Sequence, residues 1–196
     1  MYPIILCSII ALAIFLGRLW VLRRRHIIPG GFIRNVEELL KKQKISEAIF
    51  LCQGDTSSIS KIFLAGLKNT GRGMWLVKET IEDRGGREAV ILEKHVGILA
   101  TIANLTPLLG LLGTVSGMIK TFNVIAIQGV GNPAPLAGGI AEALITTAAG
   151  LSVAIPTLVC HRILKDKAES LIFEMEENSI KIIEIMETTA RKEKIP

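Results

Sequence analysis

Cysteine and histidine are scarce in this chain of 196 residues, and neither is spaced for metal binding. The three cysteines form no C-x-x-C pair, and none lies in the uncharged segment 128–139, so no disulfide framework or zinc site follows. The three histidines also lack metal-ligand spacing, and we expect each to be solvated or hydrogen-bonded. These six residues are Cys7, Cys52, Cys160, His26, His95 and His161. No metal or other cofactor is expected.

Signature motifs of common enzyme classes are missing as well. The sequence has no G-x-x-x-x-G-K-[ST], no G-x-S-x-G and no H-E-x-x-H, and no G-x-G-x-x-G follows a predicted strand. We therefore do not expect an enzyme. The formal net charge is +5, but the basic residues gather beside apolar segments, which is typical of membrane topology rather than of a nucleic-acid footprint.

Long apolar stretches are what the sequence does contain. Apolar residues make up 49% of the chain while 21% of its residues are charged, a mixture that suggests membrane helices joined to an aqueous part. Residues 2–22, 96–127 and 140–160 are each long enough, at about 1.5 Å per residue, to cross about 30 Å of hydrocarbon. The fold class that we predict is an all-α membrane protein with three transmembrane helices and long cytoplasmic helical extensions.

Charge at the ends of the spans predicts the topology. Arg23, Arg24 and Arg25 directly follow the first span, and basic residues also follow the third. Segment 128–139 has no charged residue. Because cytoplasmic flanks carry the Lys and Arg excess, we place the N-terminus and 128–139 outside, with 23–95 and 161–196 inside. The charges follow the first apolar run instead of preceding it, so we interpret it as a retained span rather than a cleaved signal peptide.

The two cytoplasmic parts are predicted to be helical. Residues 23–95 show short amphipathic helices, with Ser58 or Ser60 as a candidate cap, and from Met74 a helical pattern runs into the second span. One stripe of the third span continues through the helix 161–196, which predicts a left-handed bundle of long helices with Asn178 as a polar register position. Packing on the helix 74–95 of the same chain is the alternative, and both contacts can coexist. The stripe is Ala143, Thr147, Gly150, Ala154, Thr157, His161, Leu164, Ala168, Leu171, Met175, Asn178, Ile182 and Ile185.

Small residues line one side of the second and third spans. This is the pattern of helices that approach each other closely in lipid, although such stripes recur in membrane bundles of every function. The candidate packing residues are Pro107, Gly110, Gly117, Ala143, Gly150 and Ala154.

Hydroxyl groups are interspersed among these small residues. Thr114 lies in the second span, and Thr146 and Thr147 lie in the third, where an unpartnered hydroxyl costs free energy. Glu142 falls in the first turn of the third span, so a favourable interaction with the helix dipole is the plainer alternative to a role in transport. We find no carboxylate at mid-membrane depth, and hydroxyls do not titrate near neutrality. If protons cross here, a second protein has to bring a buried Asp or Glu.

The sequences N-L-T-P-L-L-G-L-L-G-T-V-S-G-M-I-x-T-F at 104–122 and G-I-A-E-A-L-I-T-T-A-A-G-L-x-V-A-I-P at 139–156 resemble the two signature spans of the MotA/TolQ/ExbB proton-channel family, and most closely its ExbB/TolQ branch. The resemblance implies a pentamer in the bacterial inner membrane around an ExbD/TolR-like partner that supplies an essential Asp. It places the pore threonines at Thr114 and Thr147 and the glutamate of the family at Glu142. Thr146 stands where a small apolar residue is expected, so either Thr146 or Thr147 lines the path.

The function implied by the resemblance is that of a proton-channel or stator subunit. Such a subunit uses the proton motive force to power a TonB- or TolA-like transducer in biopolymer transport or envelope maintenance. The alternative is a non-conducting scaffold that assembles and stabilises its partner. A solute transporter is disfavoured, because three spans without internal repeats enclose no binding site in one subunit. The process that is powered, and the choice between proton and sodium, stay open.

Overall fold

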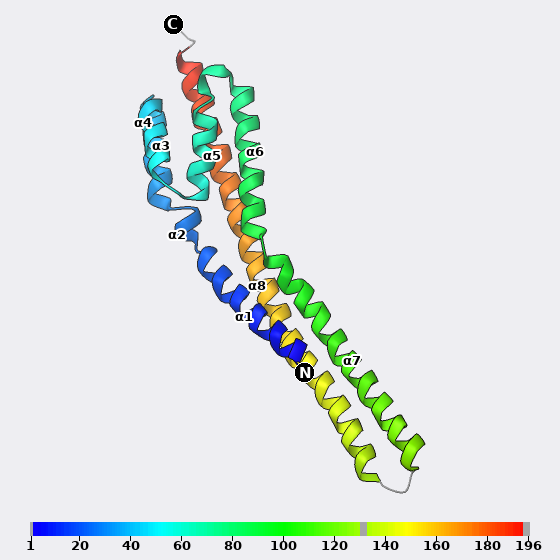
Figure 1. The fold of residues 1–196 in the computed structure, drawn as a ribbon. Helices are drawn as coiled ribbons and strands as arrows, with labels where there is room; N and C mark the ends of the chain where they lie inside the picture. Colours follow the sequence, from blue (N-terminus) through cyan, green and yellow to red (C-terminus); the bar gives the residue numbers. More distant parts are fainter. Residues whose placement is uncertain (1, 130–132, 194–196) are drawn as a thin grey trace. The chain divides into compact units, whose positions relative to one another are not determined.

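A computed structural model of the chain describes residues 2–129 and 133–193, and all regular structure within these ranges is helical. The chain divides into two compact units. Residues 1–18 and 95–164 form the first, here called the hairpin unit, and residues 19–94 and 165–196 form the second, the bundle unit. Two helices, α1 (Tyr2–Val21) and α8 (Pro133–Glu193), contribute to both units (Figure 1).

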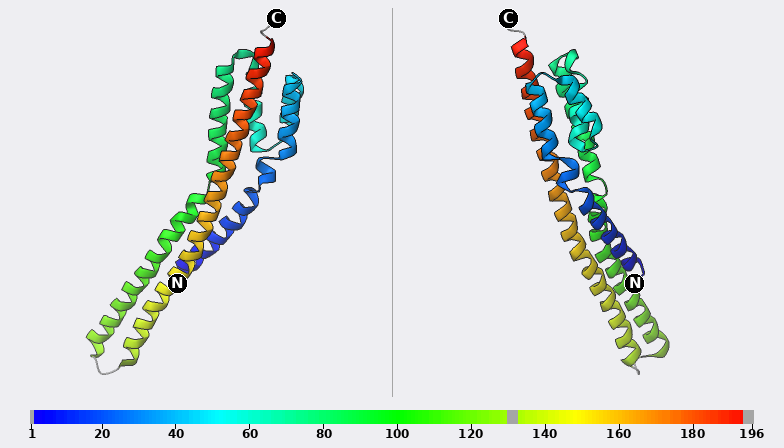
Figure 2. Two further views of the ribbon diagram at one scale, coloured as in Figure 1. Left: turned by 180° about the vertical axis from the view of Figure 1, so that it is seen from behind. Right: turned by 90° about the vertical axis from the view of Figure 1, so that its left-hand side faces the viewer.

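Three helices have the length and hydropathy of membrane spans, as predicted. One is α1, and the other two apolar windows lie within 74–127 and 136–189. In the hairpin unit, α7 (Val96–Gln128) and the first part of α8 run side by side in opposite directions (Figures 1 and 2). Pro107 and Pro156 both lie inside these helices and end neither of them.

The chain before α7 and the start of α8 differ from what the sequence suggests. The helical pattern from Met74 does not run unbroken into the second span, because α6 (Met74–Glu93) ends before α7 begins and His95 has a left-handed φ of 67°. Of the segment 128–139 that we predicted as a loop, residues 130–132 lie outside the described residues. Helix α8 already begins at Pro133, a residue well suited to a first helical turn since its missing N–H leaves no donor unsatisfied.

The bundle unit is built around α5 (Ser58–Leu67), which is buried along most of its length. Around it lie the other short helices and two long ones, α6 and the end of α8 (Figure 2). Phe63, Ile59 and Ile62 are at most 1% exposed and form the centre of the core. The short helices are α2 (Arg24–Ile27), α3 (Gly30–Lys41), α4 (Ile45–Gly54) and the 3-10 turn η1 (Thr70–Arg72).

Local hydrogen bonds fix the start of α5. The cap is Ser57, and not Ser58 or Ser60, because the Ser57 hydroxyl accepts from the Ser60 N–H at 3.3 Å. Ser60 is then free to donate its own hydroxyl to the Cys52 carbonyl at 2.6 Å, which ties α5 to the end of α4. Burial raises the pKa of Cys52 to about 12, so this thiol stays protonated at neutral pH and acts as a small core residue.

The buried stripe of α8 in the bundle unit departs from the predicted spacing. The residues predicted to be buried are buried as far as Met175. Beyond it, Ser179 and Met186 are buried where Asn178 and Ile185 were predicted. The observed spacing is closer to the 3.6-residue turn of a straight helix than to a sustained 3.5-residue repeat. Asn178 is therefore no buried register position, and its amide donates to the Glu174 carbonyl of its own helix at 2.6 Å.

Ion pairs hold the surface of the bundle unit together. Among the described residues, five of them join side chains from different helices or enter the core. They are Arg24 with Glu174, Glu37 with Lys181 at 2.6 Å, Lys78 with Glu187 at 2.5 Å, Arg84 with Glu88 at 2.7 Å, and Lys61 with Glu88 at 3.9 Å. Hydrogen bonding to Arg24 lowers the pKa of the Glu174 carboxyl below its ordinary value, and the same contact raises the pKa of Arg24.

Candidate functional site

The two helices of the hairpin unit touch backbone to backbone at their small residues. A Cβ added at Gly150 would lie 2.8 Å from the Thr106 carbonyl oxygen, and one added at Gly110 would lie 3.1 Å from the Thr147 Cα. A Cβ at Gly117 would lie 2.8 Å from that of Ala143. Such an approach is possible only where one partner has no side chain, which is the physical reason for the small stripe.

The remaining candidate packing residues are buried or half-buried. Ala143 is 3% exposed and Ala154 is 5% exposed, while Pro107 is half-buried on α7, one turn before Gly110. The three glycines and Ala143 of the stripe read from the sequence thus lie in the contact between α7 and α8 of one chain.

Thr147 joins the two helices by a hydrogen bond across this contact. Its Oγ1 donates to the Gly110 carbonyl oxygen of α7 at 3.1 Å, and the side chain is half-buried. A carbonyl has two lone pairs, so the hydroxyl satisfies its own donor without disrupting the helix that it contacts. Thr147 is therefore partly accessible and fixed in position at once.

Thr146 points to a different side of the same contact. It is 8% exposed, and its Oγ1 donates to the Ala143 carbonyl at 2.7 Å. A Cβ added at Gly113 would lie 2.5 Å from the Thr146 Oγ1. The side chain also borders a cavity of about 230 Å³ that includes Ser116 of α7 and Ile4 of α1. Thr146 fills the space that Gly113 leaves, whereas Thr147 bonds at Gly110.

Thr114 is half-buried and is not brought to either of these threonines. Its Oγ1 donates to the Leu111 carbonyl of its own helix at 2.7 Å. Within the described part of the chain, no hydrogen bond links Thr114 to Thr146 or Thr147. The three hydroxyls that the sequence grouped together thus have three separate backbone partners.

Glu142 forms an ion pair with Lys120, and sequence reasoning missed this partner. Their side-chain N and O atoms are 3.3 Å apart, and both side chains are more than 60% exposed in the single chain. The pairing could have been found from the antiparallel arrangement, because the two residues are nearly equidistant from the junction of α7 and α8, so they face each other.

Charge is otherwise sparse in the hairpin unit. Glu142 is the only Asp or Glu in the sequence of residues 1–18 and 95–164. Among the described residues there is no cluster of His, Cys, Asp or Glu able to hold a metal ion. The described residues of the site offer hydroxyls, carbonyls and one ion pair.

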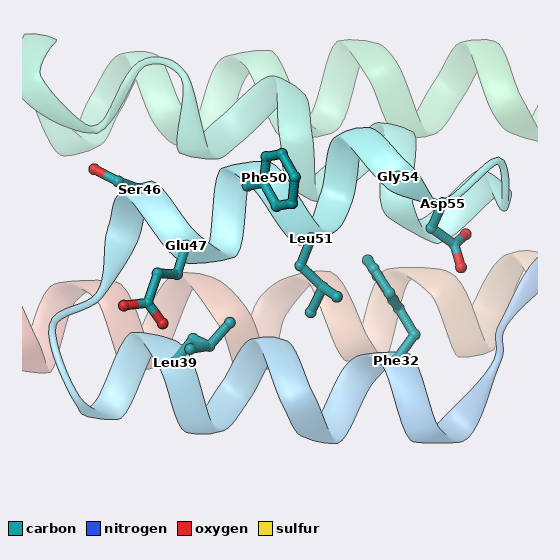
Figure 3. A pocket seen from close by; sticks show the side chains of 8 residues that line it. All are labelled: Phe32, Leu39, Ser46, Glu47, Phe50, Leu51, Gly54 and Asp55. Carbon is teal, nitrogen blue, oxygen red and sulfur yellow. The ribbon is translucent and has the colours of Figure 1, made fainter.

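A separate hollow lies in the bundle unit between α3 and α4. It measures about 640 Å³, and Phe32, Leu39, Phe50 and Leu51 supply its apolar lining (Figure 3). Its two carboxylates, Glu47 and Asp55, are already engaged. Glu47 pairs with Lys44 at 2.7 Å, and Asp55 accepts from the Ser57 N–H at 2.7 Å. Nothing in this hollow resembles a reactive site.

Comparison with known proteins gives consistent results. The sequence pattern of the MotA/TolQ/ExbB proton channel family matches residues 55–177, more than half of the chain. An ExbB-like protein of Synechocystis sp. is 38% identical over 172 residues, which is 84% of this chain and 66% of that protein. The biopolymer transport protein ExbB of Salmonella typhimurium is 32% identical over 83% of this chain and 70% of its own length. The Tol-Pal system protein TolQ of Pseudomonas aeruginosa is 35% identical over 59% of this chain and 55% of its own length.

Proposed function

Because the chain belongs to the MotA/TolQ/ExbB proton channel family, on its ExbB/TolQ branch, we propose that it is a proton-channel subunit of an energy-transducing motor in the bacterial inner membrane. The observation that carries this proposal is the family match, which spans α7 and the part of α8 that holds Thr147. Thr147 is the one candidate hydroxyl that bonds across the two helices, so it is the hydroxyl that we assign to the path.

The titrating group has to come from a partner. The only carboxylate in the sequence of the hairpin unit, Glu142, is paired with Lys120, and threonine hydroxyls do not release protons near neutral pH. We propose that an ExbD/TolR-like single-span protein supplies a membrane Asp within a ring of five copies of this chain. Five is the number that the resemblance implies.

Proton flow then supplies the work. Each charge that crosses about 100 mV releases about 2.3 kcal/mol, enough to shift a packed interface between two arrangements. The motion passes to a TonB- or TolA-type transducer, in biopolymer transport or envelope maintenance. In this arrangement the N-terminus lies in the periplasm and residues 23–95 and 161–193 lie in the cytoplasm, as the charges flanking the spans favour.

A non-conducting scaffold is the second candidate, and one observation favours it. Thr114, Thr146 and Thr147 all donate to carbonyls of their own chain, so these hydroxyls are satisfied without water. A scaffold would use the same small-residue contacts to assemble the partner without conducting.

Proton flux in vesicles separates the two candidates. The chain is reconstituted with and without an ExbD/TolR-like partner, and a pH-sensitive dye records flux under an applied potential. We expect flux only with the partner, and we expect Thr147→Val to remove most of it while assembly is retained. Thr101→Val, which changes an exposed threonine of α7, is the matched control and should conduct normally. Equal flux in the Thr147 variant would remove Thr147 from the path, and no flux with an assembled partner would favour the scaffold.

A further inference from the structure

Two adjacent glycines lie in the middle of α6, where neither the backbone conformation nor a close contact requires glycine. Gly85 and Gly86 are helical, and the positive φ values of described glycines occur only at Gly73 and Gly129. A Cβ added at Gly85 or Gly86 would meet nothing within 4 Å, so neither position is required by a close helix contact. Glycine is less favourable than alanine in a helix interior, so the pair weakens α6 without serving the fold.

What the two glycines do is leave a cavity open. They line a hollow of about 350 Å³ between α6 and the part of α8 in the bundle unit, which is within the size range of ligand sites. Its lining is mainly apolar, with Ile81 of α6 and Met175 of α8 buried and Ile180 of α8 51% exposed. We call this cavity the glycine groove.

Two carboxylates lie at its edge, one on each helix. Glu82 of α6 and Glu176 of α8 both line the groove and both are exposed. Among the described residues, neither has a hydrogen-bond or ion-pair partner, although Glu88, Glu174 and other acids of the bundle unit are paired with cations. In a chain of net charge +5, this edge is locally negative and uncompensated.

We propose that the glycine groove binds a peptide segment in which an apolar side chain stands next to Lys or Arg. The apolar lining takes the aliphatic side chain out of water, and Glu82 and Glu176 hold the cation from both helices. The sign of the charge disfavours anionic lipid headgroups and nucleic acid, which both require a basic surface. The hollow between α3 and α4 is no equivalent site, because its carboxylates are engaged within the chain. This proposal does not depend on proton conduction.

Binding is tested on the full-length protein in lipid nanodiscs. The probe is a fluorescent ten-residue peptide with a Leu-Ile-Lys-Arg centre, and its partner probe carries Glu in place of Lys and Arg. We expect saturable binding of the basic peptide that weakens as salt rises, and binding of the acidic peptide that is about tenfold weaker or more. Equal binding of the two peptides would overturn the proposal.

Filling the groove gives the sharpest variant. Gly86→Leu places a side chain in open space and improves the helix propensity of α6, so the protein is expected to fold at least as well as the parent. We expect it to lose about tenfold or more in peptide affinity, a loss of about 1.4 kcal/mol. Gly31→Leu, at an equally open helical glycine of α3 in the same unit, is the matched control and should bind normally. Unchanged binding by Gly86→Leu would refute the site.

Charge variants and a crosslink complete the test. Glu82→Gln with Glu176→Gln should weaken binding and flatten its salt dependence, while Glu79→Gln with Glu177→Gln, on the same helices but outside the groove, should not. A disulfide that forms between two copies through Ile180→Cys, together with no peptide binding by the parent protein, would assign the groove to contact between copies and overturn the proposal. An Ile180→Cys protein that stays uncrosslinked and still binds the peptide would support it.

Discussion

The hairpin unit and the bundle unit of this chain are held together by different physics. In the hairpin unit, glycines bring two backbones into contact, and hydroxyls such as that of Thr147 donate to carbonyls. In the bundle unit, large side chains such as Phe63 fill the core and charged pairs such as Glu37 with Lys181 tie helices together. Water explains the difference, because burying apolar surface drives folding only where the alternative is exposure to water. The hairpin unit should therefore be sensitive to added volume and the bundle unit to uncompensated charge.

The largest effect is expected from removing the cation that satisfies a buried carboxylate. Glu88 is fully buried, its Oε1 accepts from Arg84 at 2.7 Å, and Lys61 lies 3.9 Å from Oε2. Arg84→Met leaves this carboxylate with a weaker partner in the core, so we expect a loss of about 3–5 kcal/mol in the free energy of unfolding. The measurement is chemical denaturation of the purified protein followed by circular dichroism.

A double variant isolates the charge term in that experiment. Arg84→Met with Glu88→Leu removes both charges and should recover much of the lost stability. If the double variant is as unstable as Arg84→Met alone, packing around α6 rather than buried charge dominates, and the contrast between the units weakens.

The second effect tests volume in the hairpin unit. A Cβ at Gly150 would lie 2.8 Å from the Thr106 carbonyl oxygen and 3.1 Å from the Gly110 Cα. Both are backbone atoms, which cannot move away as the end of a flexible side chain can. We expect Gly150→Leu to cost about 3 kcal/mol, at the upper end of overpacking effects. Thermal unfolding in detergent measures it.

The matched control for Gly150 is another glycine in the same unit. Gly97→Leu, on α7, meets nothing within 4 Å and should leave the melting temperature nearly unchanged. Similar losses in the two variants would mean that any leucine for glycine exchange harms the unit, and that the close contact is not the cause.

The same contrast shows how far the sequence carries a prediction. Three spans and the stripe through Gly110, Gly117 and Gly150 are readable, because in lipid the residue type alone decides which face can approach another helix. The pair of Lys120 with Glu142 was missed, because it depends on the register of two helices and not on the pattern within either. Likewise the sequence does not distinguish the roles of Thr146 and Thr147. Only their contacts do so, with Gly113 for Thr146 and with Gly110 for Thr147.

The bundle unit was less predictable for a related reason. Local hydrogen bonds place the cap of α5 at Ser57, and the packing of α8 in the unit buries Ser179 instead of Asn178. At the start of the hairpin unit, the break at His95 likewise requires a left-handed residue that is not glycine, which no local propensity would suggest. The charged pairs join positions far apart in the sequence, as between Glu37 and Lys181, and no pattern within one helix indicates them.

The smallest effect concerns an exposed charged pair of the bundle unit and depends on pH. The Arg24 hydrogen bond lowers the pKa of Glu174 in the folded protein relative to the unfolded chain, so the folded state binds fewer protons. The pair therefore stabilises the unit fully above the unfolded pKa of about 4.3, and this contribution is lost as the pH falls through the lower folded value. We expect Glu174→Gln to be slightly less stable than the parent at pH 7 and equal to it well below pH 4, and denaturation across this range measures the difference.

Since Arg24 is exposed, the stabilisation by its pair with Glu174 should shrink further in high salt. Glu177→Gln, an exposed neighbour on α8, should show no such convergence, and if it behaves like Glu174→Gln the difference reflects net charge rather than the pair.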